Sequence, residues 1–128
     1  MAEKDIRYQP LDPDEKIMKE ATEKLKTDPT NAELWFEKGM QHNWLGENEE
    51  SIECFSIGLT YAPLHAKMHA WRGRKLISCE KYMMACSDLA IASAIDPYDF
   101  EAWYYQGVAA YLGGKYEHAK NAMPWRCH

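Results

Sequence analysis

The sequence predicts an all-α protein built from repeated pairs of antiparallel helices. The main observation is a period of 34 residues that runs through most of the 128-residue chain. Four kinds of residue keep this spacing in one register: a glycine (Gly39, Gly73, Gly107), a proline (Pro29, Pro63, Pro97), a small residue (Ser51, Ala85, Ala119) and a large apolar residue (Phe55, Leu89, Met123). Such units bury their apolar faces only by stacking on neighbours, so we expect the pairs to pack against one another.

A single capping helix is predicted ahead of the repeats, at residues 12–26, and residues 1–11 are expected to form a flexible N-terminus. Asp12 can cap this helix, and Pro13 suits its first position. An apolar stripe follows at helical spacing: Ile17, Met18, Ala21 and Leu25. We expect this stripe to cover the first repeat.

The repeat array is expected to span residues 30–123, and its first two pairs occupy about 32–65 and 66–99. A Thr30-x-x-Glu33 capping box predicts the start of the first pair, and Gly46 predicts the stop of its first helix. In the second pair, the turn is expected at Glu80–Lys81, before a helix that resumes near Met83.

The third pair, at about 100–123, is expected to be shorter. Its first helix starts after Asp99, turns at Gly113–Gly114, and is followed by a second helix from near Tyr116. Pro124 then falls where the register expects mid-helix, and proline interrupts helices. Residues 124–128 are therefore assigned to an irregular tail.

The glycine and small-residue columns predict a close contact inside each helix pair. A glycine in a helix costs about 1 kcal/mol relative to alanine, so its recurrence suggests a compensating contact. The expected partners are Gly39 with Ser51, Gly73 with Ala85, and Gly107 with Ala119.

These features resemble the tetratricopeptide repeat, whose pattern is W-x2-L-G-x2-Y…A-x3-F…P at period 34. The copies are Trp35-x2-Lys38-Gly39-x2-His42…Ser51-x3-Phe55…Pro63, His69-x2-Arg72-Gly73-x2-Leu76…Ala85-x3-Leu89…Pro97 and Trp103-x2-Gln106-Gly107-x2-Ala110…Ala119-x3-Met123. Lys38, Arg72 and Gln106 replace the usual leucine, and His42, Leu76 and Ala110 replace the tyrosine. Over about residues 32–123, the resemblance implies a right-handed superhelix of stacked antiparallel helix pairs, with about two and a half repeats.

The resemblance also implies non-catalytic binding of a protein or peptide in a concave groove lined by the first helices. The expected groove positions are Glu33, Phe36, Met40, Asn43, Trp44, Lys67, Ala70, Arg74, Ile77, Glu101, Tyr104, Val108 and Tyr111. They form an aromatic surface with Arg74 as its central cation, and interface hot spots favour aromatic and arginine side chains.

Two alternatives to an open groove follow from the same residues. Phe36, Trp44 and Tyr111 are also suited to burial against one another or against a following helix. The chain is then an assembly or regulatory segment of a larger protein, and its groove is filled by a C-terminal part of that protein or by self-association into a homo-oligomer.

One subclass of the family binds the C-terminal carboxylates of heat-shock chaperones with Lys, Asn and Arg side chains. The corresponding positions here hold other residues: Phe36, Met40, Trp71, Glu101 and Tyr105. A chaperone tail is therefore not the expected partner.

Charge and composition argue against other binding classes. The formal net charge of −5 opposes nucleic-acid binding, which requires clustered cations, and this also disfavours an RNA-binding helical repeat. No apolar run approaches the ~18 residues that a membrane helix needs, so no membrane partner is expected. Because the N-terminus shows no secretory signal, we expect a cytoplasmic protein with reduced thiols.

No catalytic, metal or cofactor site is predicted. The sequence contains neither a phosphate-binding glycine loop nor G-x-S-x-G or H-E-x-x-H. His65-x3-His69 lacks a third metal ligand at a suitable spacing. Cys54 and Cys86 are expected to pack inside second helices, whereas Cys79, near a turn, is the candidate reactive thiol.

Overall fold

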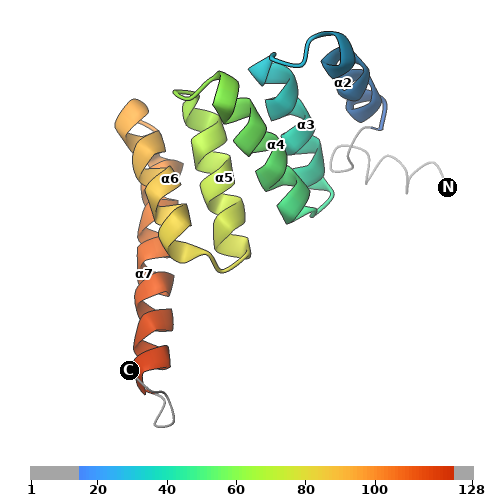
Figure 1. The fold of residues 1–128 in the computed structure, drawn as a ribbon. Helices are drawn as coiled ribbons and strands as arrows, with labels where there is room; N and C mark the ends of the chain where they lie inside the picture. Colours follow the sequence, from blue (N-terminus) through green and yellow to red (C-terminus); the bar gives the residue numbers. More distant parts are fainter. Residues whose placement is uncertain (1–14, 123–128) are drawn as a thin grey trace, which may run out of the picture. The chain divides into compact units, whose positions relative to one another are not determined.

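The computed structural model describes residues 15–122, with side chains through Glu117. In this part of the chain there are six helices and no strands: α2 (Glu15–Thr27), α3 (Ala32–Trp44), α4 (Asn48–Tyr61), α5 (Ala66–Ser78), α6 (Tyr82–Ile95) and α7 (Phe100–Ala122) (Figure 1). They pack in neighbouring pairs, in two compact units divided between Leu64 and His65. The predicted N-terminal segment 1–11, the cap residues Asp12 and Pro13, and the tail 124–128 lie outside the described residues.

In the first unit, α2 packs against α3, and α3 packs against α4. Ala21 and Leu25 of α2 are buried, while Ile17 and Met18 are half-buried. The predicted apolar stripe is therefore present and α2 uses it to cover the first helix pair.

The first helix of each pair begins at a side-chain cap in one register. The Oδ1 atom of Asn31 accepts hydrogen bonds from the backbone of Glu33 and Leu34, and Nδ1 of His65 accepts one from Met68. Asp99 Oδ1 accepts from the first backbone N–H groups of α7. The predicted Thr30 cap is wrong, because Asn31, one residue later, supplies the oxygen that satisfies the free N–H groups.

The first two predicted turns are confirmed. Gly46 follows α3 with φ 77°, and Glu80 follows α5 with φ 62°, so both adopt the left-handed conformation that ends many helices. Their N–H groups donate to the carbonyls of Asn43 and Ile77. Since Glu80 is not glycine, its turn carries the strain that Gly46 avoids.

The close contacts predicted inside the first two pairs are also confirmed. A Cβ built on Gly39 would lie 2.6 Å from the ring of Phe55, and one on Gly73 would lie 2.7 Å from Cγ of Leu89. The hydroxyl of Ser51 donates to the Gly39 carbonyl at 2.9 Å. Phe55 and Leu89 are fully buried, so each second helix inserts a large side chain against a bare stretch of the first.

The third pair differs from the prediction. Helix α7 continues through Gly113 and Gly114 without a turn, and the second helix expected from Tyr116 is the end of α7 itself (Figure 1). Tyr116 lies against Tyr82 of α6, with ring centroids 6.3 Å apart, and Gly113 lies close to Tyr82 as well. These contacts hold the C-terminal part of α7 along α6 instead of folding it back. The predicted contact of Gly107 with Ala119 is wrong for the same reason: a Cβ on Gly107 would meet no atom within 4 Å.

The two glycines provide a matched pair of alanine substitutions. We expect Gly73→Ala to lower the free energy of unfolding by about 1–3 kcal/mol, because the new methyl group overlaps Leu89 and the Ala85 carbonyl. Gly107→Ala should instead raise it by about 0.5–1 kcal/mol, through the higher helix propensity of alanine. Urea denaturation of dilute protein, followed by far-ultraviolet circular dichroism, measures both. Equal effects of the two substitutions would contradict the packing described here.

Candidate functional site

The candidate site is a surface of the second unit formed by α5 and α7, with Arg74 at its centre. The guanidinium carbon of Arg74 lies 4.0 Å from the ring centroid of Trp71 and 4.3 Å from that of Tyr105. Its Nη2 donates to the Tyr105 hydroxyl at 3.3 Å, and Nη1 lies 3.7 Å from a carboxylate oxygen of Glu101. A planar cation stacked between two aromatic rings is held in one orientation.

A small cavity of about 50 Å³ adjoins this cation. Its lining comes from α5, α7 and the loop between α6 and α7: Lys67, Ala70, Trp71, Arg74, Asp99, Glu101 and Ala102. The cavity thus brings two cationic and two anionic side chains together beside Ala70, Trp71 and Ala102.

Adjacent positive charges on α5 affect one another next to this surface. Burial lowers the pKa of Lys75, and the neighbouring charge of Arg74 lowers it further, with a small opposing effect from Cys79. Glu101, largely exposed beside Arg74, offsets part of that charge. Polar groups of both signs are therefore available to a partner at the same place.

Aromatic side chains extend the surface along α7. Tyr104 stands edge-on to Tyr105, with ring centroids 5.0 Å apart, and it is 65% exposed. Tyr111 is equally exposed, and the Lys115 ammonium lies 5.8 Å from its ring centroid. Contiguous exposed aromatic groups of this kind often mark contact surfaces.

The structure brings several of the predicted groove residues of the second unit together. Lys67, Arg74 and Glu101 line one cavity, and Tyr104 joins them through Tyr105. Two others, Ile77 and Val108, are half-buried on the same two helices. Arg74, predicted at the centre of this surface, therefore lies within ion-pair distance of Glu101 and shares a cavity with Lys67.

The predicted groove residues of the first unit all lie on α3. Glu33 and Trp44 are exposed, while Met40 and Asn43 are half-buried. Phe36 is half-buried too, and its ring packs against Phe55 with centroids 5.9 Å apart. Phe36 thus contributes to the contact between α3 and α4, and Trp44 is the most exposed apolar side chain among the predicted positions of this unit.

Two residues of the site were missed by the sequence reasoning. Trp71 and Tyr105 supply the rings that hold Arg74, although neither was placed in the groove. The spacing of Trp71 and Arg74, three positions apart on one helix, is a signal that could have identified the first. No spacing in the sequence marks Tyr105 in this way. The rotation of α7 against α5 decides whether Tyr104 or Tyr105 reaches the guanidinium of Arg74.

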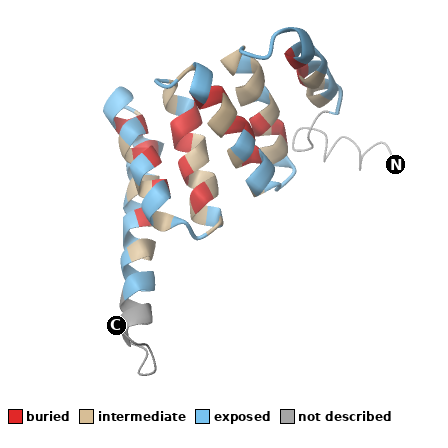
Figure 2. Cartoon of the chain, in the orientation of Figure 1, coloured by how far each residue is buried: buried red, intermediate tan, exposed pale blue. Residues whose placement is uncertain are grey.

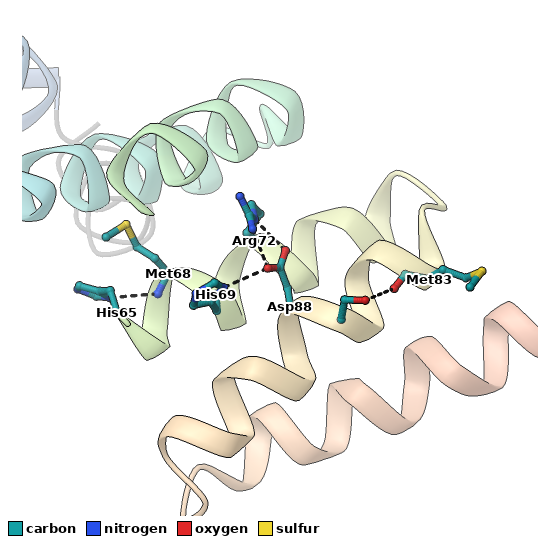
Figure 3. A network of polar contacts seen from close by, with 7 residues as sticks. His65, Met68, His69, Arg72, Met83 and Asp88 are labelled. Atoms are coloured by element: carbon teal, nitrogen blue, oxygen red, sulfur yellow. Dashed lines mark hydrogen bonds and ion pairs between the residues drawn. The ribbon is translucent and has the colours of Figure 1, made fainter. Parts of the chain in front are cut away.

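A second polar cluster lies between α5 and α6 (Figure 3). Arg72 binds Asp88 with two parallel hydrogen bonds of 2.8 Å, and Nδ1 of His69 lies 3.1 Å from the same carboxylate. The side chains of His69 and Asp88 are only 9% and 6% exposed. So little exposure leaves no open access for a substrate, and the cluster serves to join the two helices.

The repeat register explains where this cluster comes from. His69 stands in the column of Trp35 and Trp103, whose indole N–H groups donate to the Pro29 and Pro97 carbonyls at 2.9 Å. Asp88 occupies the position of the buried Cys54 in the same way. The second pair therefore replaces an indole and a thiol with an ion-paired network.

Other candidate groups have structural partners. His65 caps α5, and His69 contacts Asp88, so the two histidines serve different helices. Over residues 15–117 no group of three or more His, Cys, Asp or Glu side chains is arranged to hold a metal ion. Burial raises the pKa of the Cys54 thiol to about 11, an effect that Lys38 partly offsets, so this cysteine is a packing residue rather than a nucleophile.

The ion pair of Arg72 with Asp88 predicts that a single substitution at Asp88 destabilises the fold. Asp88→Asn should lower the free energy of unfolding by about 1–3 kcal/mol, because a neutral amide cannot replace the buried carboxylate that pairs with Arg72 and contacts His69. The control is Asp96→Asn, at an exposed position where the amide oxygen can still accept the hydrogen bond from Tyr98. Chemical denaturation of both variants measures the difference. An Asp88→Asn protein as stable as the control would contradict the role given to the cluster.

Comparison with models of known protein families and with curated protein sequences finds no match to this chain. In the part of the chain that the structure describes, no helix combines the length and the apolarity needed to cross a membrane.

Proposed function

We propose that this chain is a non-catalytic module that binds a protein or peptide on the face formed by α5 and α7. The observation that carries the proposal is the stacked Arg74, which is fixed between Trp71 and Tyr105 beside exposed tyrosines. Orienting an arginine before a partner arrives reduces the entropy lost on binding. Rigid aromatic and arginine side chains are also the ones that dominate measured interface energies.

The partner should combine an apolar side chain with a hydrogen-bonding group. Tyr104 and Tyr111 offer exposed ring faces, and Arg74 is still about one-quarter exposed despite its two aromatic neighbours. A peptide that stacks a side chain on Tyr104 would bring its backbone carbonyls or a carboxylate within reach of the guanidinium. Lys67 adds a second cation at the adjoining cavity, beside the carboxylates of Asp99 and Glu101, so a partner with polar groups of both signs fits this place.

The resemblance to tetratricopeptide repeats extends this proposal. It implies that the helix pairs form a right-handed superhelix and that Trp44 and Met40 of α3 contribute to the same concave groove. It also implies a non-catalytic scaffold role. The chaperone-tail clamp is not part of the proposal, because two of its positions are occupied by Trp71 and Tyr105, whose rings hold Arg74.

An assembly function is the second candidate, and the uninterrupted α7 favours it. The first helices of the other two pairs are covered by α4 and α6, whereas α7 runs on past the position of the expected turn. A face left uncovered in this way suits contact with another protein segment.

A binding screen tests the proposed function. Peptides selected from a random displayed library against the full chain should bind with micromolar dissociation constants. We expect Arg74→Ala to weaken the selected peptides about 30-fold or more, which corresponds to a hot-spot loss of about 2 kcal/mol. Tyr104→Ala should weaken them as well, while helicity stays close to that of the unmodified chain.

The matched control is Glu37→Ala, at an exposed position of α3 outside the proposed surface. Calorimetric titration should give the same affinity for this variant as for the unmodified chain. If Arg74→Ala and Tyr104→Ala also bind every selected peptide with unchanged affinity, the face of α5 and α7 is not the binding surface.

A further inference from the structure

An apolar groove lies where α7 passes the N-terminal turn of α6. Two adjoining cavities of about 220 and 210 Å³ form it, and both are lined by Tyr82, Met83, Gly113 and Glu117. Exposed residues predominate on this part of both helices (Figure 2). The groove shares no lining residue with the cavity beside Arg74, so it is a separate candidate site.

The size and the lining of the groove suit an inserted aromatic side chain. Each cavity is smaller than the roughly 300–1,000 Å³ of pockets that hold drug-sized ligands, so there is room for one or two large side chains. Met83 and Met84 are 80% and 59% exposed, and flexible methionine side chains make favourable sulfur contacts with aromatic rings. Tyr116, which is 50% exposed, adds a ring to the same lining.

The charges around the groove favour a cationic occupant. Glu80 and Glu117 bring two carboxylates to the larger cavity, and Lys81 is the one cation among its lining residues. A segment that carries an arginine next to an aromatic side chain therefore complements both the apolar lining and the charge.

The residues that follow α7 have this composition. Helix α7 ends at Ala122, and the chain continues as Met-Pro-Trp-Arg-Cys-His over residues 123–128. This segment contains Trp125 followed by Arg126, and it has no Asp or Glu. Pro124 opposes a further turn of helix, because it lacks a backbone N–H group and restricts the residue before it.

The same segment is long enough to reach the groove. Glu117 lies five residues before Ala122, which is about 8 Å along a helix. The three residues from Ala122 to Trp125 span up to about 10 Å when extended. A side chain on so short a linker acts at an effective concentration in roughly the millimolar range, so it outcompetes a second copy of the chain present at micromolar concentration.

We propose that residues 123–128 fold back onto this groove of their own chain. The indole of Trp125 inserts between the methionines of α6 and the ring of Tyr116. The guanidinium of Arg126 then lies beside the carboxylates of Glu80 and Glu117. The segment thereby joins the end of α7 to the start of α6 and caps the last helix pair in place of the second helix that the period predicts.

Fluorine NMR of the full chain labelled with 5-fluorotryptophan tests the proposal. The chain has five tryptophans, and comparison with Trp125→Phe assigns the resonance of Trp125. A free peptide of residues 121–128 gives the chemical shift of the same side chain in solvent. We expect the Trp125 resonance of the full chain to differ from that of the peptide and to keep its position at every protein concentration.

Substitutions in the groove identify where the indole lies. Met83→Ser combined with Met84→Ser should return the Trp125 resonance to the peptide position, because it removes the apolar lining. The matched control is Ile91→Ser combined with Ile95→Ser, which changes two exposed apolar side chains of the same helix outside the groove. This control should leave the Trp125 resonance unchanged, and far-ultraviolet circular dichroism verifies that both variants are folded.

Substitutions in the segment itself test the charge without altering the groove. Arg126→Glu should move the Trp125 resonance at least halfway to the peptide position, whereas Arg126→Lys should keep it near that of the unmodified chain. Equal shifts for these two variants would contradict the contact with the carboxylates.

Three results would overturn the proposal. A Trp125 resonance at the peptide position in the unmodified chain would show that the indole stays in solvent. A displaced resonance that returns to the peptide position on dilution would show that the occupant comes from a second copy. Equal effects of the two double serine variants would place the indole outside the groove.

Discussion

Each complete helix pair depends on one contact, in which a glycine of the first helix accepts a large apolar side chain of the second. Phe55 and Leu89 are fully buried because Gly39 and Gly73 have no Cβ to hold them off. The contact offsets the low helix propensity of glycine and fixes how each second helix lies on the first. Where it is absent, at Gly107, the second helix is absent as well, and the bare face of α7 follows directly.

The surface proposed for partner binding is a consequence of the same packing. Helix α6 lies against both α5 and α7, and the ion pair of Arg72 with Asp88 ties it to α5. With the helices held in this way, Arg74 meets Tyr105 from α7 and Trp71 from its own helix. The cation paired with Asp88 therefore joins α5 to α6, and the cation stacked between Trp71 and Tyr105 joins α5 to α7.

The period of 34 residues was sufficient to predict α3 to α6 and their first two turns. It failed at Gly113–Gly114, because two glycines are compatible with a turn and with a continuing helix. The contact of Tyr116 with Tyr82, which favours the helix, is tertiary and leaves no local signal. The 34-residue repeat also could not decide whether Thr30 or Asn31 caps α3, since the two residues are adjacent and both can cap a helix.

The distance between two spin labels on α7 tests the uninterrupted helix most directly. The labels are attached to Glu101→Cys and Glu117→Cys, in a chain whose Cys79, Cys86 and Cys127 are replaced by serine and which is diluted with unlabelled protein. A continuous helix separates these two backbone positions by about 24 Å. We expect a single distance population near that value, broadened by the label arms. A population near 10 Å, the usual spacing of packed helices, would mean that the chain turns at Gly113–Gly114, and it would contradict the uninterrupted helix.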